Sequence, residues 1–470
     1  MITVQVVVVG AGPGGYAAAF LAADLGLSAA LVDPEVNPGG VCVYRGCIPS
    51  KALLHVADLL DESKQAREWG IGFGDPKIDL GKLRDFKNRV VQRLTSGTGQ
   101  LVKHRKIQYL QGYAEIVDAH HLKVKLAGGT DEDVQFEHAI LATGSVPAIP
   151  PMLKVDDPRV MDSTGALDLP DVPKSLLVVG GGYIGLELGT VYAALGSAVT
   201  VVEMTPGLLP GADRDLVDVL ARRVSHTMAK VMLETKVVKV VPEAQGVRVS
   251  FEGKENPKEQ VFDRVLVAVG RRPNAKIPGL ERTRVQVNDR GFIAVDEQRR
   301  TNEPSIFAIG DVVGEPMLAH KASHEGRVAV EVIAGENVAF APRAIPAVVF
   351  TDPELAWAGL TEAQAAAAGR TVTIAKFPWG ASGRAITLDR TDGLTKLVID
   401  PESEQILGVG LVGPGAGELI AEGVLAIEMG ANVTDLKLSI HPHPTLTETL
   451  MESAEVFFGQ ATHVYRPRRK

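Results

Sequence analysis

The hydrophobic pattern at the start of the chain predicts a β-strand, a glycine turn, a helix and a second strand. Apolar and β-branched residues run from Thr3 to Val9 and stop at the glycine cluster of residues 10–15. An alanine-rich, helical stretch from Tyr16 to Leu25 follows, and a second apolar run from Ser28 to Val32 ends at Asp33. This order is typical of the βαβ unit that binds dinucleotides.

The glycines and the acid have separate tasks in such a unit. Glycine lets the backbone approach a pyrophosphate, whose charge the helix N-terminus stabilises, while the acid binds a ribose hydroxyl. Asp33 lies 21 residues after Gly12. Glutamate is more usual at this place, and the shorter Asp33 leaves a direct contact and a water-mediated contact both open. The glycines predicted to bind the pyrophosphate are Gly10, Gly12, Gly14 and Gly15.

The same pattern occurs a second time. An apolar strand from Leu176 to Val179 leads into the turn Gly180 to Gly185, then a helix from Leu186 to Leu195 and a strand from Ala198 to Val202 that ends at Glu203. A carboxylate at that place binds a free 2′-hydroxyl and repels a 2′-phosphate, which favours NAD over NADP. Two such units predict two dinucleotides, for instance FAD and NAD. An internal duplication with one inactive site is the alternative.

Strands that stop at glycines recur outside these units. The predicted elements are a helix at 88–103, short strands within 106–137, and strands at 138–143, 261–269 and 305–309. The last three end at Gly144, Gly270 and Gly310, where a ligand can approach the backbone closely. Asp311 follows the last of these strands. A carboxylate there is suited to binding a polyol chain or, alternatively, to capping a helix.

The pattern changes from about Ile345 onward, and no third glycine fingerprint follows. Strand-like runs at 347–351, 393–400 and 405–412 accompany helical stretches at 362–368, 417–429 and 446–458. The predicted fold class is therefore α/β, with two Rossmann-like dinucleotide-binding domains, for FAD and NAD, and a C-terminal α+β dimerisation domain. The predicted boundaries are 1–150 for the first part of the FAD domain, 151–275 for the NAD domain, 276–345 for the second part of the FAD domain, and 346–470 for the dimerisation domain.

Composition narrows the class of protein. The chain has 470 residues, 45% of them hydrophobic and 23% charged, with a net charge of −8. These values describe an ordinary globular protein and give no reason to expect nucleic acid or a membrane as a partner. The N-terminus lacks the pattern of a signal peptide, so the cytoplasm is the expected compartment. The one basic cluster, residues 466–470, is expected to be a solvated tail.

Cys42 and Cys47 are the only cysteines in the chain. A disulfide between them would close a very small loop, which removes little unfolded-state entropy, so a redox role is favoured over a structural one. Half of a metal site and two unrelated thiols are the alternatives. Pro49 suits the first turn of a helix from Ser50 to about Leu60. The positive end of that helix would favour the thiolate of Cys47.

Two histidines alternate with prolines near the end of the chain, at residues 441–444. Thr445 and Glu448 have the spacing of a capping box for a helix that begins at Leu446. Alternatively, Glu448 orients an imidazole that serves as a base for a dithiol substrate. The residues alone leave these two interpretations open.

Taken together, the cysteine segment, the doubled fingerprints, Gly310-Asp311 and the His-Pro-Thr-x-x-Glu segment resemble the flavin disulfide reductases over nearly the whole chain. The specific signature is G-G-x-C-x-x-x-G-C-I-P-S-K, matched from Gly39 to Lys51. Val41 and Tyr44 stand where this family usually has threonine and asparagine. These departures are expected to alter the surroundings of the cysteines more than their redox role.

The resemblance implies a role for each matched residue. Cys42 would exchange with the substrate, Cys47 would lie beside the flavin, and Lys51 would pair with Glu187 near the flavin ring. His443 would be the base, presented to the cysteines of a partner subunit. Further implied roles are orientation of the base by Glu448, FAD binding by Asp33 and Asp311, and binding of the NAD ribose by Glu203. The remaining cofactor-binding candidates are Gly40, Thr143, Gly144, Ser145, Gly180, Gly182, Tyr183, Ile184, Gly185, Gly270, Arg271, Gly310, Met317, Leu318, Ala319 and His320. His441 and His320 have no catalytic part, and no metal is expected.

Within the family, the resemblance is strongest to members that oxidise protein-bound dihydrolipoamide with NAD⁺. It implies a homodimer, with a partner that carries the lipoyl group in a 2-oxo acid dehydrogenase complex or the glycine cleavage system. A glutathione-type NAD(P)H reductase is the alternative, against which Glu203 argues. Mercuric and large thioredoxin reductases need a further C-terminal redox pair that this chain lacks. The third alternative is a flavoprotein without thiol chemistry.

Overall fold

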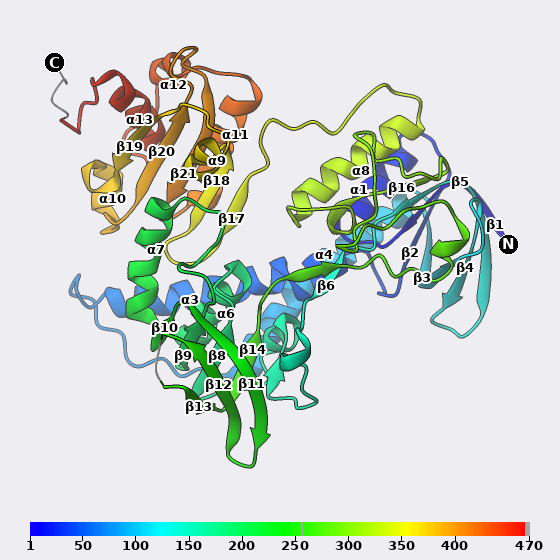
Figure 1. The fold of residues 1–470 in the computed structure, drawn as a ribbon, viewed down its shortest axis with the longest axis horizontal. Helices are drawn as coiled ribbons and strands as arrows, with labels where there is room; N and C mark the ends of the chain where they lie inside the picture. Colours follow the sequence, from blue (N-terminus) through cyan, green and yellow to red (C-terminus); the bar gives the residue numbers. More distant parts are fainter. Residues whose placement is uncertain (255–256, 466–470) are drawn as a thin grey trace.

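The computed structural model describes residues 1–254 and 257–465. It confirms the predicted α/β class: two sheets of mainly parallel strands are joined to a separate antiparallel sheet near the C-terminus (Figure 1). The basic cluster 466–470 lies outside the described residues. Across the described part of the chain, no helix has the length and apolar character needed to cross a membrane.

The first sheet is built around the predicted N-terminal βαβ unit. Its parallel strands run in the order β3-β2-β1-β5-β16, while β4 pairs antiparallel with β3 and with the start of β5. The bounds are β1 (Ile2–Val9), β2 (Ala29–Asp33), β3 (Gln108–Ile116), β4 (His121–Leu126), β5 (Asp131–Leu141) and β16 (Ile306–Ala308). Two helices, α1 (Pro13–Asp24) and α8 (Ala319–Ile333), pack against each other beside this sheet. Glycine permits this packing, because a Cβ at Gly14 would lie 2.9 Å from the carbonyl oxygen of Ala322.

The second sheet contains the second fingerprint. Its parallel order is β10-β9-β8-β14-β7, from β7 (Val160–Met161), β8 (Ser175–Val179), β9 (Ala198–Val202), β10 (Lys230–Met232) and β14 (Arg264–Val267). Its helices are α5 (Ser163–Leu167), α6 (Tyr183–Leu195) and α7 (Arg214–Thr227). An antiparallel sheet of β11 (Thr235–Glu243), β12 (Gly246–Gly253) and β13 (Glu259–Phe262) adjoins it. A short ribbon of β6 (Ser145–Pro147) and β15 (Arg271–Pro273) links the first unit to the second.

The single strand predicted at 261–269 is wrong. The chain there forms two strands, β13 and β14, which belong to different sheets. Asp263 separates them, because its carboxylate accepts hydrogen bonds from the backbone and the hydroxyl of Ser175 at 2.8 and 3.1 Å. A buried apolar run on both sides of one aspartate gave no local sign of this break.

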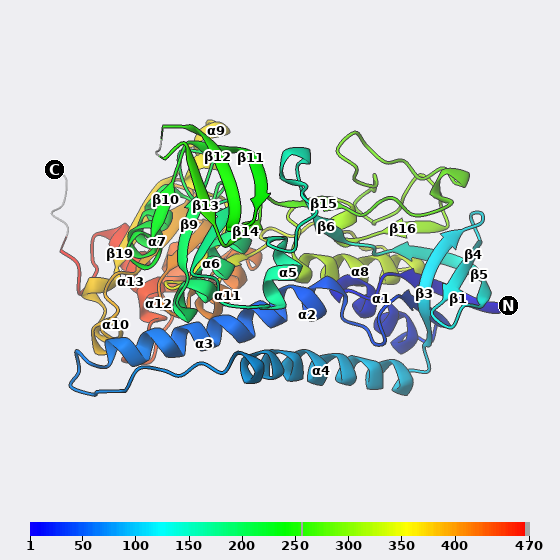
Figure 2. The ribbon, with the colours of Figure 1, turned by 90° about the horizontal axis from the view of Figure 1, so that it is seen from below.

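The C-terminal sheet is antiparallel, in the order β17-β18-β21-β20-β19. Its strands are β17 (Ala347–Val349), β18 (Leu355–Gly359), β19 (Thr373–Pro378), β20 (Leu394–Ile399) and β21 (Ile406–Val412). The accompanying helices are α9 (Glu362–Ala367), α10 (Gly383–Thr387), α11 (Ala416–Glu428), α12 (Val433–Leu438) and α13 (Glu448–Phe458). Two strands, β18 and β19, were not expected from the sequence. The remaining helices, α2 (Gly40–Arg45), α3 (Cys47–Gln65) and α4 (Leu80–His104), follow one edge of the molecule, with α3 and α4 side by side (Figure 2).

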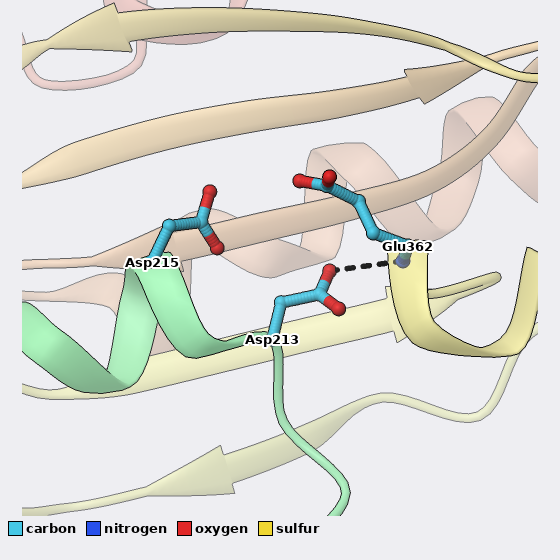
Figure 3. A group of neighbouring side chains, drawn as sticks. All are labelled: Asp213, Asp215 and Glu362. Atoms are coloured by element: carbon cyan, nitrogen blue, oxygen red, sulfur yellow. Dashed lines mark hydrogen bonds between the residues drawn. The ribbon is translucent and has the colours of Figure 1, made fainter. Parts of the chain in front are cut away.

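A partly buried ion cluster joins the second unit to the C-terminal sheet. Asp213 and Asp215 lie at the start of α7 and Glu362 at the start of α9, with their carboxylates gathered in one place (Figure 3). The ammonium of Lys396, on β20, lies 2.6, 2.8 and 2.9 Å from these three groups and is 1% exposed. Lys396 therefore contacts all three carboxylates and offsets part of their negative charge. A second ammonium, from Lys376, contacts Asp215 at 2.6 Å.

We expect Lys396→Met to lower the free energy of unfolding by about 3 kcal/mol, because removing one partner of a buried ion pair leaves charge uncompensated. Urea denaturation of the dimer would measure this loss. The matched control is Lys82→Met, whose ammonium is 85% exposed and pairs with Asp79 at 3.8 Å. That change is expected to cost less than about 0.5 kcal/mol. Equal losses for both variants would contradict a stabilising role of the cluster.

Candidate active site

The two cysteines lie at a junction between helices. Cys42 is in α2, and Cys47 is the first residue of α3. Gly46 lies between the two helices, where a Cβ would come within 2.9 Å of the carbonyl oxygen of Val41. This close approach lets one helix turn directly into the next and brings the thiols within hydrogen-bonding distance. The helix that was predicted to begin at Ser50 begins at Cys47 itself, and Pro49 lies in its first turn, as expected.

The two thiols have opposite protonation preferences. The hydrogen bond from the Cys42 thiol, together with the nearby Lys51 ammonium, lowers the pKa of Cys47 to about 7. The same hydrogen bond and burial raise the pKa of Cys42. In the reduced pair, the proton therefore stays on Cys42 and the negative charge on Cys47. This agrees with the charge predicted for Cys47 from the sequence.

Lys51 is held from two other parts of the chain. Its ammonium lies 2.8 Å from the carboxylate of Glu187 on α6, which is 5% exposed. The other oxygen of Glu187 accepts a hydrogen bond from the backbone N–H of Phe350 at 3.0 Å. Residues from the first unit, the second unit and the C-terminal region thus meet beside the cysteines.

Both cysteines line a cavity of about 420 Å³. Most of the cofactor-binding residues predicted from the sequence line it as well: Gly10, Gly12, Gly14, Gly15, Asp33, Gly40, Lys51, Thr143, Gly144, Ser145, Tyr183, Ile184, Glu187, Arg271, Gly310, Asp311, Met317 and Ala319. The cavity thus runs from the acid at the end of β2 to the two sulfur atoms. The predicted fingerprint and the predicted redox pair belong to one site.

The backbone around this cavity is shaped for an elongated ligand. Gly10 has φ +100, and a Cβ there would lie 2.3 Å from the oxygen of Ala142, so strand packing requires glycine. At Gly12, by contrast, a Cβ would have its nearest neighbour at 3.9 Å, and at Gly144 no described atom lies within 4 Å. Side chains at Gly12 and Gly144 would enter the cavity instead of striking protein. The cradle fits a dinucleotide whose phosphates approach the bare backbone.

Asp33 is buried at the end of β2 and accepts hydrogen bonds from the backbone N–H groups of Ala11 and Glu35, at 2.7 and 3.0 Å. Burial raises its pKa despite these bonds. Glu203 is arranged in the same way in the second unit, where it accepts from the N–H groups of Gly181 and Thr205 at 2.7 and 2.8 Å. Each acid therefore fixes the turn of its own fingerprint and also lines a cavity.

Asp311 does not cap a helix. It lies inside a short 3-10 turn, Gly310–Val312, whereas α8 begins only at Ala319. Its carboxylate accepts a hydrogen bond of 2.5 Å from the hydroxyl of Ser145, which in turn accepts one of 2.7 Å from Arg271. The capping interpretation is thus wrong, and the carboxylate faces the first cavity.

A second cavity, of about 1800 Å³, lies along the second fingerprint. The predicted residues that line it are Gly180, Gly182, Tyr183, Ile184, Glu203, Gly270, Arg271, Met317 and Leu318. A Cβ added at Gly182 would have no described atom within 4 Å, so here too the backbone is open to a ligand. Tyr183, Ile184, Arg271 and Met317 also line the first cavity, so the two cavities share a wall.

Two of the predicted cofactor-binding residues line neither cavity in the described chain. Gly185 packs against the turn, since a Cβ there would lie 2.3 Å from the oxygen of Gly180. His320 is directed to the backbone, with its Nε2 2.8 Å from the carbonyl oxygen of Pro346. Gly185 therefore supports the packing of the fingerprint turn and lines neither described cavity.

His443 and Glu448 form a pair on the C-terminal region. Nδ1 of His443 lies 2.9 Å from one oxygen of Glu448, and the backbone N–H of Thr445 donates to the other at 2.7 Å. Burial disfavours ionisation of Glu448, but these two hydrogen bonds prevail and lower its pKa. His443 is 71% exposed, and neither residue of the pair is among the described residues that line the two cavities. The imidazole is therefore oriented, with Nε2 directed away from Glu448.

Only one bond of the predicted capping box forms, from the backbone N–H of Thr445 to the carboxylate of Glu448. Helix α13 begins at Glu448 instead of Leu446, its N-cap is Thr447, and the hydroxyl of Thr445 donates to the carbonyl of Pro442. His441 is used differently from its neighbour. Its ring is bound on both sides, 2.8 Å from Glu422 and 2.9 Å from the oxygen of Ser439, and its side chain is 6% exposed.

Glu325 was not found from the sequence. It is fully buried on α8 and accepts a 2.6 Å hydrogen bond from the N–H of Gly310, next to Asp311. Arg299 and Lys321 neutralise it at 3.0 and 3.1 Å. A glutamate in an ordinary helix carries no local sign of this role, which depends on a contact between distant elements.

The two departures from the usual signature have different surroundings. The hydroxyl of Tyr44 donates to the carbonyl of Asn37 at 2.9 Å and so ties α2 to the loop after β2. Val41 is partly exposed and lines the first cavity, so an apolar side chain stands there in place of a hydroxyl. Tyr44 thus braces the loop that carries Pro34 and Glu35, both of which line the same cavity.

Comparison with known proteins agrees with this geometry. A profile of the pyridine nucleotide-disulphide oxidoreductases matches residues 4–326, and a profile of the dimerisation domain of the same family matches residues 345–454. The chain belongs to the pyridine nucleotide-disulphide oxidoreductase family. FAD and NAD are the cofactors of this oxidoreductase, and its dimerisation domain indicates a homodimer.

Similar members of the oxidoreductase family include dihydrolipoyl dehydrogenases. Those of Haemophilus influenzae and Geobacillus stearothermophilus are 49% and 45% identical, covering 100% and 98% of this chain and 98% of each relative. Among solved structures, LpdA of Mycobacterium tuberculosis has a TM-score of 0.89 at 27% identity, covering 97% of this chain and 100% of that one. The flavoprotein disulfide reductase RclA of Escherichia coli, in a Cu(II) complex, has a TM-score of 0.86 at 28% identity, with the same coverage.

Proposed function

We propose that the protein is a dihydrolipoyl dehydrogenase, which oxidises protein-bound dihydrolipoamide to lipoamide and reduces NAD⁺ to NADH. The observation that carries this proposal is the pair Cys42 and Cys47, with split protonation preferences, in the wall of a dinucleotide cavity. The full-length similarity to dihydrolipoyl dehydrogenases supports the same substrate. The carboxylate of Glu203 in the second cavity supports NAD.

The cysteines perform the thiol chemistry in two exchanges. One thiolate of dihydrolipoamide attacks Sγ of Cys42 in the disulfide form, and the S–S bond breaks so that Cys47 leaves as a thiolate. The second substrate thiol then displaces Cys42 from the mixed disulfide, and lipoamide leaves as the cyclic disulfide. Cys47 is the suited leaving group, because its pKa is lowered to about 7. FAD held in the first cavity would supply the electron carrier between the reduced Cys42–Cys47 pair and NAD⁺.

His443 takes the protons that the substrate thiols must lose. Glu448 fixes the ring through Nδ1, which leaves Nε2 as the base. Because the ring is exposed and stands outside both described cavities of its own chain, we assign it to the cysteines of the other protomer. Each of the two active sites thus takes its thiols from one subunit and its base from the other.

The proposed function also implies domain assignments for the chain and partners for the protein. We assign residues 1–150 and 276–345 to the FAD domain, 151–275 to the NAD domain and 346–470 to the dimerisation domain, which agrees with the grouping of the sheets. Lys51, Asp33, Ser145 and Asp311 would hold FAD, and Glu203 would hold the ribose of NAD. The substrate would be a lipoyl-bearing protein of a 2-oxo acid dehydrogenase complex or of the glycine cleavage system. The cytoplasm stays the predicted compartment.

Steady-state assays of the wild-type protein test this assignment. With dihydrolipoamide, kcat/KM for NAD⁺ is expected to exceed that for NADP⁺ by about 100-fold or more, because the Glu203 carboxylate repels a 2′-phosphate. NADPH with oxidised glutathione serves as the comparison pair. Faster turnover of the glutathione pair would assign the protein to a different branch of the family.

A further inference from the structure

Phe350 lies where three parts of the fold meet, directly after β17. Its backbone N–H donates to Glu187 at 3.0 Å, as described above. Its ring faces the Lys51 ammonium, whose nitrogen is 4.4 Å from the ring centroid. An ammonium at this distance from an aromatic face is attracted by the quadrupole of the ring. Phe350 therefore contacts both members of the Lys51–Glu187 ion pair.

The ring holds this cation without neutralising it. Several titratable groups act on Lys51 or on the nearby Cys47 thiol, from different elements: Tyr16, Cys42, Tyr183, Glu187 and Glu354. Of these, Glu187 already supplies one full negative charge at 2.8 Å. A second carboxylate at the place of Phe350 would cancel the effect of Lys51 on the cysteines. An aromatic face attracts the ammonium but adds no net charge.

We propose that Phe350 is a positioning residue for the Cys47 thiolate, because its ring holds the Lys51 ammonium where the ammonium stabilises that charge. The proposal rests on the proposed function, in which Cys47 lies beside the flavin. It assigns to the first residues of the dimerisation domain a part in setting the thiolate fraction of a cysteine in the FAD domain. Phe350 acts through Lys51 and lines neither cavity in the described chain.

The test uses FAD-loaded dimer in a Cys42→Ser background, in which Cys47 is the only thiol and no turnover is needed. A Cys47 thiolate against an oxidised flavin should give a long-wavelength absorbance band, and its pH titration reports the thiolate fraction. We expect Phe350→Leu to move the midpoint to higher pH, with about threefold less thiolate at a pH below it. The Leu variant keeps the backbone hydrogen bond to Glu187, so the change isolates the ring.

Three further variants complete the test. Phe350→Tyr retains the aromatic face and is expected to restore the original midpoint. The matched control is Phe458→Leu, which removes the ring beneath another lysine, Lys437, at 4.8 Å, and is expected to leave the midpoint unchanged. Phe350→Met serves as a second aliphatic variant, and FAD content and thermal midpoint verify that each variant is folded.

The outcomes separate the inference from the proposed function. If the Cys42→Ser protein with Phe350 intact binds FAD but shows no long-wavelength band, the placement of Cys47 beside the flavin is wrong. If the band is present but its midpoint is the same with Phe, Leu and Met at position 350, the role of the ring is overturned. A raised midpoint in Leu and Met, and an unchanged one in Tyr, supports the inference.

Discussion

Replacing Cys42 by alanine is expected to reduce turnover of dihydrolipoamide by at least about 10⁴-fold, because Cys47 alone cannot form the disulfide that the substrate thiol attacks. The loss should be confined to the thiol half of the reaction. FAD would stay bound, since the cavity is lined by many other residues. Dihydrolipoamide-dependent reduction of NAD⁺ by the purified dimer is the measurement.

A second activity of the Cys42→Ala variant serves as its control. Electron transfer from NADH to ferricyanide needs the second cavity and the flavin but no disulfide, and it is expected to persist in Cys42→Ala. A variant that still oxidises dihydrolipoamide at the wild-type rate would show that the cysteines do not carry the reaction. Loss of both activities together with FAD would point instead to a disrupted cavity.

Replacing His443 by glutamine is expected to lower kcat/KM for dihydrolipoamide by about 10²- to 10⁴-fold, the usual contribution of a positioned base. Glutamine keeps the size of the side chain but cannot take a proton at neutral pH. The matched control is His441→Gln, two residues away, whose ring is already bound to Glu422 and to the backbone. That variant is expected to stay within about threefold of the wild type.

Mixing the two inactive variants tests whether the base comes from the partner. In a heterodimer of Cys42→Ala and His443→Gln subunits, one of the two sites has both an intact cysteine pair and an intact histidine. Random reassociation is therefore expected to restore about a quarter of the wild-type activity, since half of the dimers are mixed. If the mixture stays inactive after verified subunit exchange, His443 acts within its own chain.

The sequence predicted best what is encoded locally. Glycine spacing and apolar runs placed both fingerprints, with Asp33 and Glu203 each at the end of a strand and each bound to its own turn. The cysteine segment was equally local, because Gly46 and the helix that starts at Cys47 are neighbours in the chain. Patterns of this kind need no knowledge of the tertiary fold.

What the sequence could not predict depends on contacts between distant segments. The break at Asp263 arises from pairing with Ser175, and the role of Glu325 arises from its bond to Gly310. Phe350 meets Lys51 across about 300 positions of the sequence. The Thr445–Glu448 spacing failed for a different reason. The motif is local and one of its bonds forms, but the helix begins at Glu448 and not at the predicted Leu446. The roles of Phe350, Glu325 and Asp263 each became visible only once the chain was folded.

The wall shared by the two cavities has a consequence for the order of events. The cysteines line only the first cavity and Glu203 lines only the second, while Tyr183 and Arg271 face both. With the first cavity assigned to FAD and the second to NAD, the substrate thiols would react at the cysteines and the nicotinamide in the second cavity, so the two need not be bound at the same time. Between the two half-reactions the protein itself would hold two electrons. Its reduced form would then be an intermediate with its own lifetime, which a small oxidant could oxidise before NAD⁺ does.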